Sequence, residues 1–93
     1  MSAPYFVYSN HALDNLTIRD IERSWVERTV MAPDETEPDP KYPERTRAFR
    51  EVPECGGRIL RVVYVRDGET IRIVTVFLDR GRRRAQRAGQ LRP

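Results

Sequence analysis

The stretch that decides the fold is residues 58–78, RILRVVYVRDGETIRIVTVFL. Two runs rich in β-branched and aromatic residues, 58–66 and 70–78, flank the dipeptide Asp67-Gly68. An Asp-Gly pair between two such runs is a strong hairpin signal, because glycine adopts the positive φ of a tight turn at no steric cost. The sequence therefore predicts two antiparallel strands joined by a two-residue turn.

A third strand is predicted directly before this hairpin. Residues 46–52 form another strand-like run, and Gly56-Gly57 separates it from residue 58. Three consecutive antiparallel strands are therefore expected. Near the amino terminus, the aromatic and β-branched run 5–8 predicts one more strand, which we expect to pair with the same sheet.

Two helices are predicted between the first strand and the other three. Ser9-Asn10 offers N-cap oxygens for a short helix through Leu16. A second helix is expected over about 18–30, and it ends before Pro33 because the residue preceding a proline avoids the helical conformation. The apolar residues of this second helix recur at helical spacing and are expected in the core: Ile18, Ile21 and Trp25.

These elements predict an α+β fold in the order β-α-α-β-β-β, with two N-terminal helices packed on a four-stranded antiparallel sheet. Residues 33–43 contain four prolines and four acidic residues, and a loop is expected there. A chain of 93 residues is about one domain, which we assign to residues 1–80. Residues 81–93 are basic and nearly devoid of apolar side chains, so a disordered tail is expected.

Strand register predicts where the arginines lie. If both turns contain two residues, Arg50, Arg61 and Arg72 share one side of the sheet, and Arg80 extends the row. A five-residue connection at residues 53–57 would instead turn Arg50 to the other side. The opposite side is expected to receive the helices and carries apolar residues: Phe49, Leu60, Val62, Tyr64, Ile71, Ile73 and Phe77.

Charge is unevenly distributed along the chain. Residues 1–44 contain 4 basic and 9 acidic side chains, whereas residues 45–93 contain 13 basic and 5 acidic side chains. The second half is therefore expected to attract anions. Arginine suits bidentate phosphate recognition, although a GC-rich genome would produce the same preference for arginine without selection for function.

The cysteine and histidine content restricts the possible chemistry. With only one cysteine, Cys55, the chain has no intrachain disulfide, and with only one histidine, His11, it lacks the usual ligand set of a structural zinc site. We therefore expect no metal and no cofactor. No apolar run is long enough to predict a membrane span, so we expect a cytoplasmic protein with no membrane partner.

Several motifs in this order resemble an uncharacterised family of small bacterial RelE-like domains related to BrnT-type toxins. The resemblance rests on the run Ser9-Asn10-His11-Ala12-Leu13, the proline-rich break, the Gly-turn hairpin and the ending Ile73-Val74-Thr75-Val76-Phe77. It implies a RelE-like fold, with two helices against one side of an antiparallel sheet. Ribonuclease members of that superfamily use basic residues from the other side against RNA, whereas ParE-type members are linked to inhibition of DNA gyrase. Asn15 stands where relatives often have a basic residue.

Candidate site residues follow from this resemblance and from the arginine row. The catalytic candidates are His11, Arg61, Arg72 and Arg80, and the candidates for nucleic-acid binding are Arg50, Arg61, Arg72, Arg82, Arg83 and Arg84. Metal-free RNA cleavage needs a base, an acid and cations that stabilise the developing phosphorane charge. The arginines could supply those cations, and His11 has the pKa range for proton transfer. Alternatively, His11 stabilises the helix start and the arginines form a solvated surface.

Two functions are consistent with these residues. The first is a toxin-type, metal-independent ribonuclease of a bacterial toxin-antitoxin system, with RNA or the ribosome as target and a cognate antitoxin as partner. The alternative is a non-catalytic domain of the same fold that binds nucleic acid or protein. Tyr42, in the acidic proline-rich segment, is expected either to contact a partner or to lie in a mobile loop.

Overall fold

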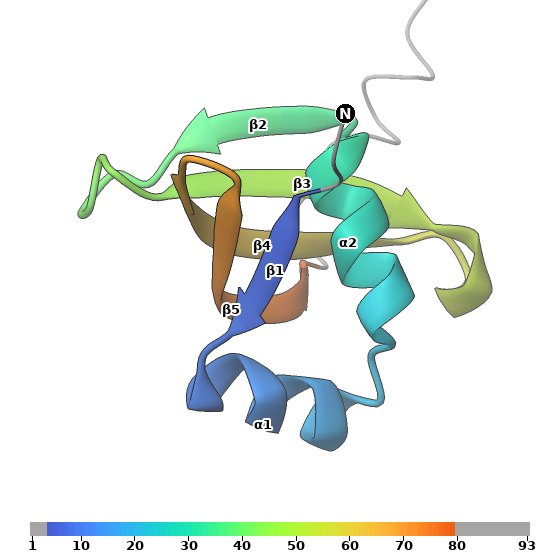
Figure 1. Ribbon diagram of the computed structural model, residues 1–93. Coiled ribbons are helices and arrows are strands. Elements are labelled where there is room, and N and C mark those ends of the chain that lie inside the picture. Colours follow the sequence, from blue (N-terminus) through green and yellow to red (C-terminus); the bar gives the residue numbers. More distant parts are fainter. Residues whose placement is uncertain (1–3, 80–93) are drawn as a thin grey trace, which may run out of the picture.

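Two helices and a five-stranded mixed sheet form the part of the chain that the computed structural model describes, residues 4–79 (Figure 1). In chain order the elements are β1 (Tyr5–Tyr8), α1 (Asn10–Arg19), α2 (Arg23–Met31), β2 (Glu35–Pro38), β3 (Thr46–Val52), the short 3-10 helix η1 (Pro53–Cys55), β4 (Arg58–Asp67) and β5 (Thr70–Asp79). The strand order is β1-β5-β4-β3-β2. The α+β class and the two helices are confirmed, whereas the four-stranded antiparallel sheet is wrong in strand number and in direction.

The additional strand, β2, lies inside the segment for which the sequence predicts a loop. It pairs antiparallel with β3, from Glu35 opposite Phe49 to Pro38 opposite Thr46. Pro38 fits because β2 is an edge strand, where a missing N–H need not interrupt the ladder. Prolines and charges argue against a central strand, but they are also the residues that protect a sheet edge from aggregation.

The other edge strand, β1, runs parallel to β5. Tyr5 lies opposite Thr70, and Tyr8 lies opposite Ile73. Both helices and the three strands β2, β3 and β4 lie between these partners in the chain, so the first and last described strands meet side by side (Figure 1). This parallel pair makes the sheet mixed rather than antiparallel, whereas β2 adds only a fifth strand.

Helix α1 begins where the sequence predicts. The Ser9 hydroxyl oxygen accepts a hydrogen bond from the Ala12 N–H at 3.0 Å, which satisfies one of the free donors of the first turn. The helix ends at Asp20, which has a left-handed φ of 56°. The N–H of Ile21 then donates to the Leu16 carbonyl at 2.9 Å and closes the end of the helix.

The position of this helix end corrects the predicted second helix. Instead of one helix over 18–30, Ile18 belongs to α1 and α2 starts at Arg23. Ile18 is 77% exposed, whereas Ile21 in the connection is only 5% exposed. Trp25 is buried on α2, as predicted. Ile18 is therefore not a core residue. The left-handed Asp20 changes the direction of the chain, so Ile18 on α1 and Ile21 after it no longer share one helix face.

The core lies between the helices and one face of the sheet. Helix α2 packs against β3 and β4, and α1 packs mainly along β5. The buried residues of this cluster are Ala12, Ile21, Trp25, Val26, Val30, Val52, Leu60, Val62, Ile71, Ile73 and Val76. A polar contact also joins α2 to β1: the Tyr8 hydroxyl donates to the Glu27 carboxylate at 2.8 Å. Burial, followed by this hydrogen bond, raises the pKa of Tyr8.

The register between β3 and β4 follows the predicted alternative with a five-residue connection. Val52 pairs with Arg58, and Arg50 pairs with Leu60. Arg50 therefore lies on the helix side of the sheet, where its guanidinium donates to the carbonyl of Ala32 at the end of α2. The prediction that Arg50 shares a row with Arg61 and Arg72 is wrong.

The register between β4 and β5 also differs from the prediction. The turn consists of Gly68 and Glu69 rather than Asp67-Gly68, so Val65 pairs with Arg72. Gly68 has a φ of 63°, a conformation that glycine adopts freely. A register shift then adds one residue to β5, because Tyr64 pairs with Ile73 and Val63 pairs with Thr75.

The extra residue in β5 changes which side chains face the helices. Arg61 pairs with Phe77, whereas without the extra residue it would pair with Val76. As a result, Val76 is buried in the helix-facing core and Phe77 is turned to the other side. The predicted apolar side is correct for Leu60, Val62, Tyr64, Ile71 and Ile73, and wrong for Phe49 and Phe77.

Candidate nucleic-acid interface

The second face of the sheet carries the arginines that the sequence singles out. It lies opposite the core described above, and within residues 4–79 we call it the helix-free face. Among its members, as the strand pairings show, are Tyr5, Val7, Arg47, Phe49, Ile59, Arg61, Val63, Val65, Arg72, Phe77 and Asp79. Phe49 and Val63 are buried, so this face has a small apolar centre of its own.

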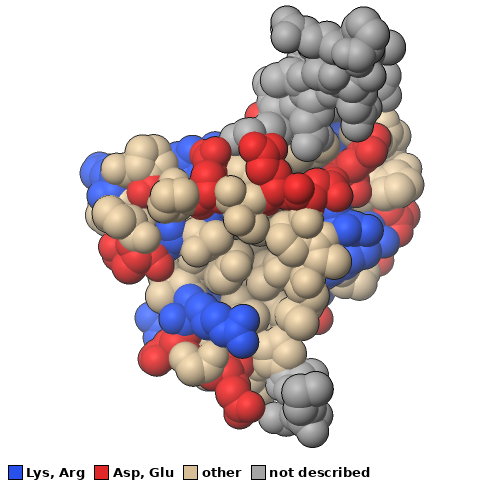
Figure 2. Space-filling model, turned by 90° about the horizontal axis from the view of Figure 1, so that it is seen from above, with Lys and Arg blue, Asp and Glu red and all other residues tan. Residues whose placement is uncertain are grey.

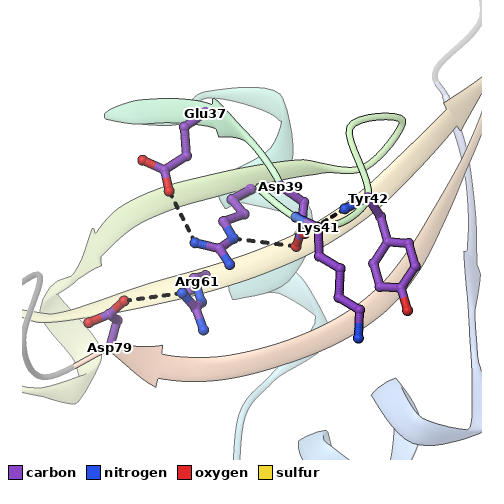
Figure 3. Close-up of polar contacts among 7 residues, drawn as sticks. Glu37, Asp39, Lys41, Tyr42, Arg61 and Asp79 are labelled. Atoms are coloured by element: carbon purple, nitrogen blue, oxygen red, sulfur yellow. Dashed lines mark hydrogen bonds and ion pairs between the residues drawn. The ribbon is translucent and has the colours of Figure 1, made fainter.

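Arg61 is engaged by its neighbours on this face. Its guanidinium carbon lies 3.9 Å from the centre of the Phe77 ring, and its Nη1 lies 3.8 Å from Oδ2 of Asp79 (Figure 3). Its side chain is only 22% exposed. The charge of Arg61, a predicted nucleic-acid-binding residue, is therefore partly neutralised, and its side chain is largely covered within the protein.

Arg47, on the neighbouring strand, is held by two carboxylates. Its Nη1 lies 3.2 Å from the Glu37 carboxylate, and its Nε lies 3.5 Å from the Asp39 carboxylate. The N–H groups of Tyr42 and Lys41 also donate to Asp39 at 3.0 and 2.9 Å (Figure 3). These backbone hydrogen bonds, with a smaller contribution from Arg47, lower the pKa of Asp39.

Arg72 differs from both of these arginines. Its side chain is exposed, and within residues 4–79 no hydrogen bond or ion pair engages it. Val7 of β1 lies on one side of it and Val65 of β4 on the other. Arg72 also borders a hollow of about 360 Å³ near the β4–β5 turn, whose other lining residues are Val65, Arg66, Asp67 and Thr70.

Arg61 and Arg72 share a face but do not lie together. Arg72 pairs with Val65, which is four residues from Arg61 along β4. At about 3.3 Å per residue, the two arginines are separated by about 13 Å along the strand. They cannot clamp one phosphate between them in this arrangement. The prediction that Arg61 and Arg72 share a face is confirmed.

Of the predicted site residues not yet placed, the structure describes only His11, which lies on α1 and not on this face. His11 is exposed in the first turn of α1 and makes no hydrogen bond or ion pair with a residue in the range 4–79. Arg80, Arg82, Arg83 and Arg84 lie outside the described residues. Within residues 4–79, no hydrogen bond or ion pair joins His11 to Arg61 or Arg72.

The exposed tyrosines were only partly anticipated. Tyr42, which the sequence marks as a possible partner contact, is 39% exposed, with the Arg45 guanidinium carbon 4.1 Å from its ring centre. Tyr5 is 70% exposed at the edge of the helix-free face, and sequence reasoning missed it. The only available signal was the alternation in the run 5–8, where Phe6 and Tyr8 pack on the core and Tyr5 and Val7 do not.

The surface is not uniformly basic. Seen from above, acidic side chains form a band, and the lysines and arginines form separate groups (Figure 2). On and beside the helix-free face, Arg47 and Arg61 are matched by Glu37, Asp39 and Asp79. Of the three arginines on this face within residues 4–79, Arg72 is therefore the one without a carboxylate partner.

Two further properties concern the described residues alone. Across residues 4–79, no three His, Cys, Asp or Glu side chains are grouped in a way that could hold a metal ion. Neither α1 nor α2 is long and apolar enough to cross a membrane.

The fold and this face define a small α+β domain with both helices on one side of a mixed sheet. The model of the family described as a domain of unknown function (DUF4258) matches residues 8–78, about three quarters of the chain. The chain belongs to this family. Comparison with curated proteins and with solved structures finds no match.

Proposed function

We propose that this chain is a non-catalytic RNA-binding domain of the RelE-like fold, and that it contacts a backbone phosphate through Arg72. The observation that carries the proposal is the state of Arg72: it is exposed on the helix-free face and has no partner within residues 4–79. A guanidinium in this state can form charge-assisted, bidentate hydrogen bonds with a phosphate without first breaking an ion pair.

Arg66 and Asp67 both lie beside Arg72, and Arg66 supplies a second guanidinium at this end of the sheet. Arg66 borders the same hollow, where its Nε donates to the Gly68 carbonyl at 3.2 Å, which leaves its terminal nitrogens for a ligand. The centre of the face is a poorer phosphate site, because Asp79 already competes for Arg61. A nucleic acid is therefore expected to contact the β4–β5 turn end first.

The test is the affinity for a fluorescently labelled RNA, measured by anisotropy with wild type, Arg72→Gln and Arg19→Gln. Arg19 is an exposed arginine at the end of α1, so its substitution removes the same charge away from the sheet face. We expect Arg72→Gln to weaken binding about tenfold and to flatten the log-log salt dependence by about 0.7. Arg19→Gln should stay within about twofold of wild type. Equal losses in both variants would contradict the proposed site.

A toxin-type ribonuclease of a toxin-antitoxin system is the second proposal. The arrangement of both helices on one side of the sheet, with Arg61 and Arg72 on the other, supports it because the RelE-like resemblance implies that arrangement. A cleavage site would still need a base and an acid near the phosphate. His11 is in contact with neither arginine through a hydrogen bond or an ion pair.

Incubation of the purified protein with free RNA and with ribosome-bound messenger RNA, both in EDTA, separates the two proposals. Cleavage by wild type that is lost in the double variant Arg61→Ala/Arg72→Ala would establish the ribonuclease. Binding of RNA without cleavage would support the non-catalytic RNA-binding domain and contradict the ribonuclease. A short neighbouring reading frame encoding an antitoxin-like protein would favour the toxin, because a toxin must be produced together with its inhibitor.

A further inference from the structure

We infer that Tyr5 stacks on a nucleotide base, so that the RNA bound beside Arg72 is single-stranded. This inference rests on the proposed function and extends it from phosphate binding to the state of the ligand. The two residues belong to different strands that are distant in sequence, and the parallel pairing of β1 with β5 brings them to the same face.

The register places Tyr5 within reach of a ligand held by Arg72. Tyr5 pairs with Thr70 and Val7 pairs with Arg72, so Tyr5 and Arg72 are diagonal neighbours across two strands. With strands about 4.8 Å apart and a rise of about 3.3 Å per residue, their Cα atoms lie about 8 Å apart, which long and aromatic side chains can span. A ligand phosphate at the Arg72 guanidinium therefore leaves an adjacent base near the Tyr5 ring.

Exposure of Tyr5 supports a role in binding rather than in folding. Its side chain is 70% exposed, although the same strand buries Phe6 and Tyr8 against the core. Val7, between Tyr5 and Arg72 on this face, is 39% exposed. This end of the helix-free face therefore presents the Tyr5 ring, the apolar Val7 and the Arg72 guanidinium side by side. An aromatic ring beside a cation is the combination that binds a nucleotide by base stacking and by phosphate contact.

Stacking on an aromatic side chain requires an unpaired base. In a duplex both faces of each base are covered by its neighbours, whereas single strands expose them, and every base offers such a face. The hollow beside Arg72 adds the Thr70 hydroxyl and the Asp67 carboxylate, which can bond ribose hydroxyls. Tyr5 is thus expected to add affinity for single strands and almost none for duplex RNA.

Tyr42 provides a matched control within the same chain. It is also exposed, and it has Arg45 at 4.1 Å and Lys41 at 5.4 Å from its ring. Its loop, however, follows the acidic strand β2, and Asp39 is part of the turn itself. The loop therefore carries charges of both signs, and its two cations already lie against the Tyr42 ring, so loss of this tyrosine should leave RNA binding nearly unchanged.

The experiment compares wild type, Tyr5→Ala, Tyr5→Phe and Tyr42→Ala by anisotropy with a labelled 12-nucleotide oligouridine and with a 12-base-pair RNA duplex. We expect Tyr5→Ala to bind the single strand about tenfold more weakly and the duplex within about twofold of wild type. Tyr5→Phe keeps the ring and should retain wild-type affinity, and Tyr42→Ala should remain within about twofold.

The outcomes separate this inference from the proposed function. If Arg72→Gln weakens binding and Tyr5→Ala does not, the stacking role is wrong and the phosphate site stands. The same conclusion follows if Tyr5→Ala weakens single strand and duplex equally, or no more than Tyr42→Ala does. If wild type binds neither RNA, the proposed function fails together with the inference. Far-UV circular dichroism of each variant verifies that the fold is retained.

Discussion

The sharpest test of the fold compares two isoleucines that are three residues apart. Ile18 is 77% exposed at the end of α1, and Ile21 is 5% exposed in the connection before α2. Helical spacing alone would place both in the core. The structure instead predicts that Ile18→Ala and Ile21→Ala have very different effects on the free energy of unfolding.

The expected magnitudes follow from burial. Isoleucine to alanine removes three carbons, worth about 0.8 kcal/mol each when buried, and the remaining cavity adds to this loss. Ile21→Ala should therefore cost about 2–4 kcal/mol, which lowers the melting temperature by roughly 10–25 °C in a domain of this size. Ile18→Ala should change stability by at most about 0.5 kcal/mol, because alanine is the better helix former and little burial is lost.

Urea denaturation of both variants, followed by fluorescence, measures this difference. Trp25 is the only tryptophan and is buried beside the core, so its emission reports on tertiary unfolding. Circular dichroism should give the same midpoint if the transition is two-state. Equal losses in the two variants, or a larger loss in Ile18→Ala, would refute the placement of the α1–α2 connection and with it the packing of both helices.

Three further predictions concern an ion pair, a buried phenol and a helix end. Asp79→Asn should remove the ion pair of Arg61, raise RNA affinity about two- to fivefold and steepen its log-log salt dependence by up to about 0.7. The control Asp14→Asn, on the exposed side of α1, should have a smaller effect, and salt titrations of RNA affinity measure both variants. Folding raises the pKa of Tyr8, so the contribution of its neutral phenol to the free energy of unfolding is complete below about pH 10 and is lost as the pH rises toward the folded-state pKa. Urea denaturation at increasing alkaline pH should therefore show a smaller loss of stability for Tyr8→Phe than for wild type. Asp20→Gly should stabilise the protein by about 0.5–1 kcal/mol in thermal melts, because glycine adopts the left-handed conformation without strain, and a destabilised variant would contradict that argument.

Local sequence signals predicted most of the secondary structure. The Ser9 cap, the break after α2 before Pro33 and the strand character of residues 58–78 are properties of a few neighbouring residues, and the structure has all three. Helix ends were less accurate, because Asp20 gave no sign in the sequence that it would adopt a left-handed conformation. Non-glycine residues rarely do so, and the hydrogen bonds of the α1 end stabilise it here.

The candidate site was harder to predict than the fold. Arg61 and Arg72 were correctly assigned to one face, because each lies between two apolar residues of its strand that face the helices. The state of each arginine depends on partners from other strands: Arg61 has Asp79 as an ion-pair partner, whereas the residues opposite Arg72 on β1 and β4 are Val7 and Val65. A single-residue change of register exchanges such partners. The sequence therefore predicts where a charge lies, but not whether another residue of the protein already pairs with it.

The sequence by itself therefore determined the α+β class, the two helices, the hairpin of residues 58–78 and a face that carries arginines. These features arise from interactions over a few residues, such as caps, alternation and glycine turns, whose free energies depend little on the rest of the chain. Only the tertiary structure decided that an acidic, proline-containing segment becomes β2, that β1 runs parallel to β5, and that an extra residue in β5 directs Phe77 away from the helices. Each of these depends on contacts between residues far apart in the chain: an edge strand forms when a partner strand offers its backbone groups, and a bulge is retained when it allows the side chains after it, here Val76, to fill the core.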